Sequence, residues 1–188
     1  MAQSKILVDT NSYFRLAKSI HPLLFVEFGS PSYCLYVIPE LDVELRRNPA
    51  LQTKFAWAAE DEYASNRKRY PSLSRKDLAA VQNAYDFIWN HVQDELPGPS
   101  RVDARNLAYA YVLNIPVVTD DRDMRELAKV FEIRTMVSLE LAKLMCDCGH
   151  IQPKKVKEML EYWRYWNDLP YNAQADFVRL FGDLPQSG

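Results

Sequence analysis

Four short apolar segments, each followed by a stretch with helical spacing, constrain the fold of this 188-residue chain more than any other feature. The segments span residues 6–8, 35–38, 117–119 and 134–137. Apolar runs this short, with helices between them, are typical of buried parallel strands. We therefore expect an α/β fold, a three-layer α/β/α sandwich with a parallel sheet of four to five strands and some extra helices.

Helix signals divide the rest of the chain into one domain and a tail. Ser74-Arg75-Lys76-Asp77 and Ser100-Arg101-Val102-Asp103 are capping-box patterns, in which serine and acidic side chains bind the first free N–H groups of a helix. We predict a domain over residues 1–150 with a helical insertion near 49–96. Residues 151–188 are predicted to form a helical extension that packs on the domain or on a second subunit.

Carboxylates follow two of the predicted strands and lie on two of the predicted helices. Asp9 follows the first strand, and Asp121 follows the third with Asp123 close behind. Glu44 lies on the helix after the second strand, and Asp103 lies in the first turn of a later helix. Ligands of parallel sheets bind beyond the carboxyl ends of the strands, so we expect these acids to converge at one edge of the sheet.

Converging carboxylates repel one another unless a cation lies between them. Oxygen ligands without histidine or cysteine suit Mg²⁺ or Mn²⁺, as one or two ions. Such ions activate water and stabilise charge in phosphodiester hydrolysis. Each acid also has a simpler interpretation, in which Asp9, Asp103 and Asp121 are turn or helix caps and Glu44 is a surface charge.

Four segments resemble the PIN domain family, the nuclease fold of VapC-type toxins and several RNA-processing enzymes. They are Ile6-Leu7-Val8-Asp9-Thr10-Asn11, Ile38-Pro39 through Val43-Glu44-Leu45, Asp103-Ala104-Arg105-Asn106-Leu107-Ala108, and Val117-Val118-Thr119-Asp120-Asp121-Arg122-Asp123-Met124. The metal ligands that the resemblance implies are Asp9, Glu44, Asp103 and Asp121. It implies that Asp123 assists catalysis and that Asn11 and Thr119 orient carboxylates or water.

The activity that this resemblance implies is a metal-dependent endoribonuclease acting on single-stranded or structured RNA. A toxin-like role, with an antitoxin or other inhibitor protein as partner, belongs to the same family. The helical insertion and the tail depart from a compact VapC-like protein, so a toxin with a paired antitoxin is not assumed.

A basic segment lies within the insertion. Residues 66–76 carry five basic side chains and no acidic one: Arg67, Lys68, Arg69, Arg75 and Lys76. These can hold RNA phosphates while Tyr70 stacks on a base, or they can be a solvated helix end. The aromatic residues around Trp163 pose a similar choice between stacking on RNA and packing on the body or a second copy. We favour RNA binding for the basic segment and packing for the aromatic residues.

Three other functions compete with RNA hydrolysis. A catalytically inactive PIN-like module would bind RNA or protein. A DNA nuclease would use the same arrangement of acidic residues. A phosphatase-type phosphotransfer enzyme of the haloacid-dehalogenase kind needs a second aspartate where Asn11 stands. The apolar run before Asp9 is too short for a signal peptide, no run approaches a membrane span, and three cysteines suit a reducing compartment. We therefore expect a cytoplasmic protein with no membrane partner.

Overall fold

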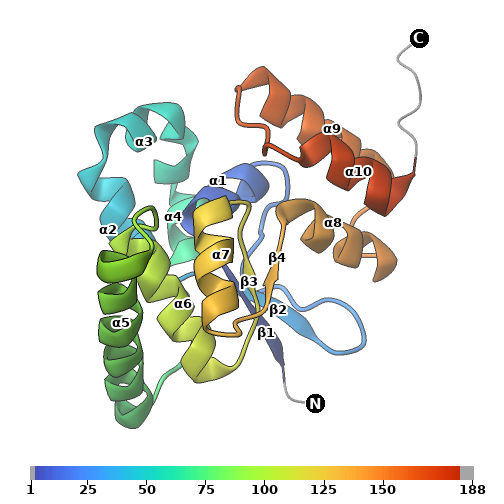
Figure 1. Cartoon of the computed structure of the whole chain (residues 1–188). Coiled ribbons are helices and arrows are strands. Elements are labelled where there is room, and N and C mark those ends of the chain that lie inside the picture. The colour runs from blue at the N-terminus through green and yellow to red at the C-terminus, as the bar shows by residue number, and fades with distance from the viewer. Residues whose placement is uncertain (1–2, 183–188) are drawn as a thin grey trace.

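A computed structural model describes residues 3–182 and contains a parallel four-stranded sheet flanked by helices (Figure 1). The strands are β1 (Ser4–Val8), β2 (Tyr33–Tyr36), β3 (Val117–Val118) and β4 (Thr135–Met136), in the spatial order β2-β1-β3-β4. The helices are α1 (Thr10–Ala17), α2 (Glu40–Arg47), α3 (Pro49–Lys54), the 3₁₀ helix η1 (Ala56–Ala59), α4 (Asp61–Arg67), α5 (Arg75–Glu95), α6 (Arg101–Leu113), α7 (Arg122–Val130), α8 (Ser138–Asp147), α9 (Pro153–Tyr165) and α10 (Ala173–Phe181). The predicted α/β fold is confirmed. Residues 1–2 and 183–188, the outer ends of the two predicted units, lie outside the described residues.

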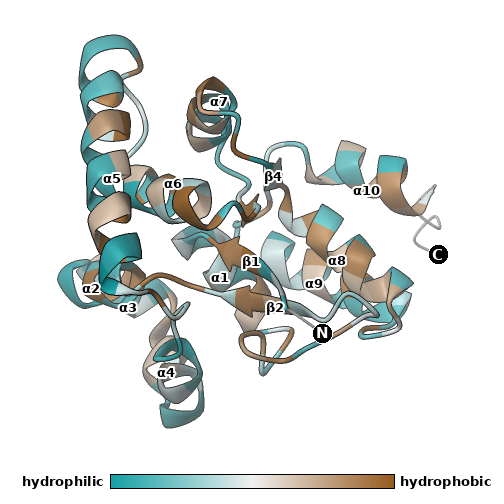
Figure 2. Cartoon of the chain, turned by 90° about the horizontal axis from the view of Figure 1, so that it is seen from below, coloured by the Kyte–Doolittle hydropathy of each residue, from teal (hydrophilic) through white to brown (hydrophobic). Residues whose placement is uncertain are grey.

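Two apolar cores lie on opposite faces of the sheet, because successive strand residues point to opposite sides. Ile6 and Val8 of β1 pack in one core with α1, α8 and α9, and Leu7 packs in the other with α5, α6 and α7. Figure 2 shows the apolar residues on the strands and on the helix surfaces that face them. Both faces of the sheet are therefore covered, which gives the three layers.

The strand order changes direction at β1. The chain passes from β1 to β2 on one side and later crosses to β3 on the other side. In such sheets the point where the connections diverge is the usual ligand site. The β1–β3 ladder continues past the strand ends, where the Asp9 N–H donates to the Val118 carbonyl at 3.0 Å. The Thr119 N–H likewise donates to Met136 at 2.9 Å, so the backbone holds Asp9 and Thr119 firmly at this edge.

Capping patterns in the sequence mark where several helices begin. Both predicted capping boxes are present, with Ser74 and Ser100 each bonded to the aspartate three residues later. The first helix begins at Thr10, directly after its cap Asp9. Ser138 is the first residue of α8, and its N–H and hydroxyl both donate to Asp120.

The tail packs on the domain through α9. Trp163 is 1% exposed, and its indole Nε1–H donates to the Arg15 carbonyl at 2.8 Å. Arg15 lies in the last turn of α1, where carbonyl groups have no partner within the helix. The tail therefore completes the hydrogen bonding of α1. None of the helices among residues 3–182 is long and apolar enough to cross a membrane.

Candidate active site

Asp9 lies at the carboxyl end of β1 and is only 2% exposed. Its Oδ1 accepts the Ser12 N–H at 2.5 Å, which caps α1, and its Oδ2 accepts the Thr119 hydroxyl at 2.5 Å. Burial raises the pKa of Asp9 from 3.8 to about 7, and the nearby Asp120 carboxylate adds to this rise. The hydrogen bonds from Thr119 and Ser12 oppose it. The fold therefore holds a desolvated carboxyl group at the centre of the sheet edge.

Thr119 connects Asp9 to the acids that follow β3. Its hydroxyl donates to Asp9 and accepts the Asp121 N–H at 3.1 Å. Asp121 caps α7, since its Oδ1 accepts the Met124 N–H at 2.8 Å. Asp123 lies one residue into the helix, exposed and against Gly98, where an added Cβ would stand 2.7 Å from Oδ2 of Asp123. Gly98 thus lets the α5–α6 loop approach the start of α7.

Asp103 lies near enough to Glu44 and Asp121 for their charges to act on its carboxyl group. Its Oδ2 accepts the Ser100 N–H at 2.7 Å in the capping box of α6. Burial raises the pKa of Asp103, and the Asp121 and Glu44 carboxylates raise it further, against the bonds from Ser100. Glu44 contributes a buried Oε2 that has no hydrogen-bond partner among the described residues. Thr119 connects Asp9 to Asp121, and the charges of Asp121 and Glu44 act on Asp103, so we call these four acids the acidic row.

Two polar residues at the site carried no predicted role in binding. Asn106 lies three residues after Asp103 on α6, is 1% exposed and has an Oδ1 without a partner within residues 3–182. The buried Thr10 hydroxyl, next to Asp9, has none there either. Spacing of three residues places Asn106 on the face of α6 that carries Asp103, a signal present in the sequence. Asn11, expected to orient water or a carboxylate, is exposed at the start of α1.

The donor set suits a hard divalent cation, although its members are spread out. Carboxylate and amide oxygens that are buried and unpartnered are the groups such a cation satisfies. Within residues 3–182, however, no three histidine, cysteine or acidic side chains lie close enough together to hold a metal ion. Asp9, Asp103 and Asp121 each use one oxygen to cap a helix, which fixes them in place and leaves the other oxygen of Asp103 and Asp121 for a ligand.

Asp120, beside Asp121, has a different role from its neighbours. Its Oδ2 accepts a bond from Arg15 Nη1 at 2.8 Å, and its Oδ1 accepts the Ser138 N–H at 2.9 Å. Arg15 Nε also contacts Asp168 Oδ2 at 3.1 Å, and Lys54 binds the other oxygen of Asp168 at 2.8 Å. This ion-pair chain ties the tail, α1 and α3 to the end of β3. Both carboxylate oxygens of Asp120 are thereby bound within the protein, and we assign Asp120 a structural role.

The basic segment divides into one buried residue and four exposed ones. Arg67 is 3% exposed, its Nε binds Asp42 Oδ1 at 3.0 Å, and its Nη1 donates to the Tyr13 hydroxyl at 3.4 Å. This burial argues against contact between Arg67 and an RNA strand. Tyr70 also donates to Asp42, at 3.0 Å, so its hydroxyl is engaged inside the protein. The exposed members are Lys68, Arg69, Arg75 and Lys76.

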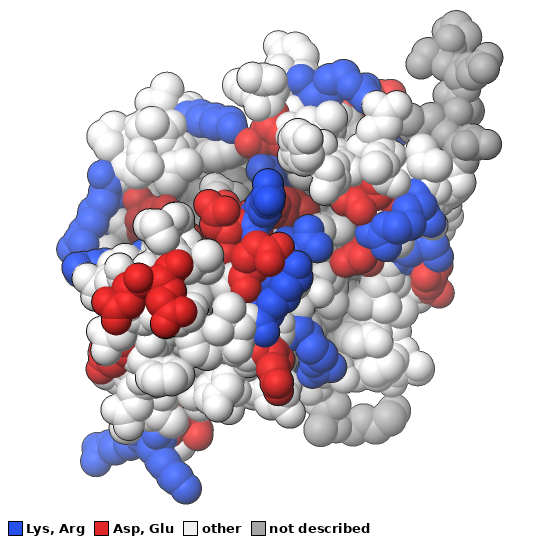
Figure 3. Space-filling view, viewed as in Figure 1, with Lys and Arg blue, Asp and Glu red and all other residues white. Residues whose placement is uncertain are grey.

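A pocket of about 480 Å³ adjoins the acidic row between α2 and the α5–α6 pair. Glu40 and Glu44 line it together with three arginines, which are Arg47, Arg101 and Arg105. Figure 3 shows acidic and basic side chains interleaved over the middle of the face that it displays. The arginines of this pocket lie apart from the basic segment, and no local run of charge marks them in the sequence.

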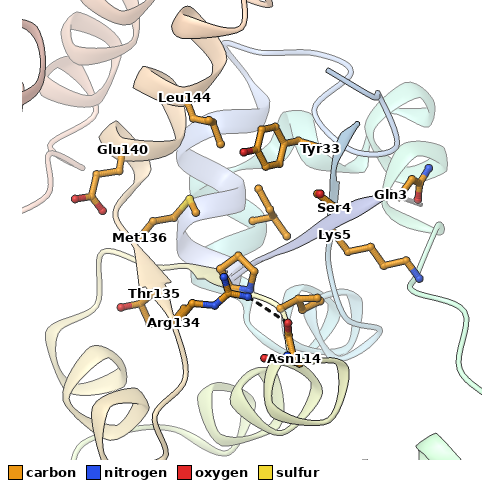
Figure 4. Close-up of a pocket in the computed structure, with 13 residues that line it drawn as sticks. Gln3, Ser4, Lys5, Tyr33, Asn114, Arg134, Thr135, Met136, Glu140 and Leu144 are labelled. Atoms are coloured by element: carbon orange, nitrogen blue, oxygen red, sulfur yellow. Dashed lines mark hydrogen bonds between the residues drawn. The ribbon is translucent and has the colours of Figure 1, made fainter. Parts of the chain in front are cut away.

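A second pocket, of about 900 Å³, lies at the opposite edge of the sheet (Figure 4). Residues at the amino ends of the strands line it, among them Ser4, Pro116 and Thr135. Arg134 lies across it and donates to the Asn114 carbonyl at 3.3 Å. None of the acids of the row lines this pocket.

Comparisons with known proteins give little beyond the fold described here. No protein-family model and no curated protein sequence matches the chain. The crystal structure of FitAcB from Neisseria gonorrhoeae matches with a TM-score of 0.47 and 15% sequence identity, over 71% of this chain and 98% of that chain. A likeness of this degree leaves the function to be argued from the geometry of the site.

Proposed function

We propose that this chain is a metal-dependent endoribonuclease with a PIN-like site at the carboxyl edge of its sheet. One observation carries the proposal: Glu44 Oε2 is buried without a partner among residues 3–182, and burial together with the nearby Asp121 and Glu44 carboxylates raises the pKa of Asp103. Mutual repulsion in such a group disfavours the ionised form unless a cation binds. A row of this kind at the switch point of a parallel sheet suits metal-assisted hydrolysis of a phosphodiester.

Each residue has a defined part in this proposal. Glu44, Asp103, Asp121 and Asp9 would share one or two Mg²⁺ or Mn²⁺ ions, because no three acidic side chains of residues 3–182 lie close enough to bind one ion together. A bound divalent ion supplies water activation and stabilises negative charge on the phosphate. Thr119 positions Asp9 and the backbone of Asp121 through its two hydrogen bonds. Asp123, exposed at the start of α7, would assist from the outer side of the row.

A cleavage assay with metal controls tests the proposal. The protein is incubated with mixed-sequence single-stranded RNA in Mn²⁺, Mg²⁺ or EDTA. We expect metal-dependent cleavage that Asp103→Asn lowers by more than about 100-fold, since loss of supporting groups alone costs 10–100-fold. Asp94→Asn is the matched control, because Asp94 is an exposed residue of α5 and takes no part in the row. Equal activity of the two variants would refute the assignment, and the same assay with DNA separates a DNA nuclease.

A catalytically inactive RNA-binding module is the second candidate. The observation in its favour is that the acids of residues 3–182 do not converge as a set of three, while Asp9, Asp103 and Asp121 all cap helices. Such a module would bind RNA in EDTA and leave it intact in Mn²⁺. An antitoxin or other inhibitor protein, a homodimer and a cytoplasmic location stay predictions of the sequence.

A further inference from the structure

The pocket between α2 and the α5–α6 pair contains the groups that the acidic row lacks. The row alone repels the phosphates of a nucleic acid. Arg47 is the last residue of α2, and Arg101 is the first residue of α6. Both residues line the pocket together with Glu44. We call this cavity the arginine pocket, defined by Glu40, Glu44, Arg47, Arg101 and Arg105.

Aromatic rings of α5 fix two of the arginines. The Arg105 guanidinium carbon lies 3.9 Å from the centre of the Tyr85 ring, and that of Arg101 lies 5.3 Å from the Trp89 ring. Stacking on a ring leaves the in-plane N–H groups of a guanidinium free to donate. Contact with Trp89 therefore restricts the Arg101 side chain in advance, which lowers the entropic cost when it binds an anion.

The arginines differ in how much of their charge is already used. Arg105 Nε lies 3.4 Å from Glu40 Oε1, and Arg105 Nη1 donates to Gln82 at 3.0 Å. Among residues 3–182, neither Arg47 nor Arg101 forms an ion pair with an acid. Arg105 thus braces α2 against α6, while Arg47 and Arg101 are available for an anionic ligand.

The arginine pocket also contains carboxylate oxygens that could accept hydrogen bonds from a ligand. Glu40 Oε2 is buried and has no partner among the described residues, as is true of Glu44 Oε2. A buried, unpaired carboxylate oxygen is costly until a donor reaches it. A ligand that satisfies the pocket therefore combines a negative group with N–H or O–H donors. A ribonucleotide has both, in its phosphate and in its ribose and base.

We propose that the arginine pocket binds the nucleotide next to the scissile phosphodiester of an RNA strand, with its phosphate on Arg47 and Arg101. The position next to a scissile bond rests on the proposed function, whereas RNA binding rests on the pocket itself. Glu44 belongs to both the pocket and the acidic row, and Val102 of the pocket directly precedes Asp103, so a strand bound here would lie beside the row. The arginine pocket would thereby set the register in which the strand enters the site.

Binding without cleavage tests the pocket. Fluorescence anisotropy of a labelled single-stranded RNA in EDTA measures affinity for wild type, Arg47→Gln and Arg101→Gln. Each variant is expected to raise Kd by about 5- to 10-fold near 0.1 M salt and to lower the slope of log K against log salt by about 0.7. Arg101→Lys should restore the slope because it keeps the charge. Arg134→Gln, at the opposite edge of the sheet, is the matched control.

The two proposals fail in different ways. Kd values for Arg47→Gln and Arg101→Gln equal to that of Arg134→Gln would overturn the pocket, as would a wild type that binds no RNA in EDTA. If the two variants bind RNA more weakly than wild type, and wild type cleaves no RNA in Mn²⁺, the nuclease proposal is overturned and the pocket is retained as an RNA-binding site. Urea unfolding of each variant, expected within about 0.5 kcal/mol of wild type for these surface changes, excludes misfolding as the cause.

Discussion

Asp9→Asn should stabilise the metal-free protein, by an amount that grows with pH. The folded pKa of Asp9 is about 7 and its ordinary value is 3.8, so between these limits the folded state binds more protons than the unfolded state. The free energy of unfolding therefore falls as pH rises through this window, by about 1.4 kcal/mol per pH unit. From pH 5 to pH 8 the loss amounts to roughly 3 kcal/mol. Asparagine carries no such loss, and its Oδ1 can still accept the Ser12 N–H that caps α1.

Urea unfolding of both proteins in EDTA at pH 5, 6, 7 and 8 measures this difference. The stability gap between variant and wild type is the quantity to follow, because the other titrating groups cancel in it. Asp120→Asn is the matched control, since it makes the same change one residue after Thr119 but breaks the ion pair with Arg15 and should destabilise at every pH. A stability difference that stays constant from pH 5 to pH 8, or a variant less stable than wild type at pH 8, would show that burial does not raise the pKa of Asp9 in the folded protein.

Three further substitutions test contacts described above, each by urea unfolding. Trp163→Phe should cost about 1–2 kcal/mol, because the Arg15 carbonyl loses the indole N–H that donates to it, whereas Tyr165→Phe at an exposed position should cost nothing measurable. Arg67→Met should cost about 3–5 kcal/mol by leaving Asp42 without its buried partner, against less than about 0.5 kcal/mol for the exposed Lys68→Met. Ser100→Ala should cost about 1 kcal/mol and also lower RNA cleavage, while Ser74→Ala, which removes the other capping box, should cost the same and leave cleavage intact.

The sequence was sufficient to place the acidic residues at strand ends and helix starts but not to separate their roles. Strand ends and capping boxes are local patterns, and they located Asp9, Asp103 and Asp121 correctly on the fold. The interpretation of these acids as helix caps is confirmed, and their role as metal ligands stays a prediction. A carboxylate has two oxygens, so capping with one of them leaves the other for a ligand in Asp103 and Asp121. Local pattern therefore could not choose between the two interpretations.

Residues whose role depends on distant partners could not be assigned from the sequence. Arg67 stands in a basic run, and only the fold reveals Asp42, 25 residues earlier, as its buried partner. Asp120 differs from Asp121 only through Arg15, which lies 105 residues away. The arginine pocket joins side chains from α2 and α6 that have no common motif. Charge runs along a chain thus say little about which charges remain exposed.

The Trp163 bond to α1 has a consequence for the order of synthesis. Residues 10–17 emerge from the ribosome early, yet α1 gains its last hydrogen bond from residue 163 and its ion pair with Asp168 later still. Chains lengthen at about 5–20 residues per second, so α1 spends several seconds without these partners. During that interval the carboxyl edge of the sheet lacks the contacts that hold Arg15 against Asp120. A nascent chain therefore carries all the acids of the row before the tail is available to hold Arg15 in place.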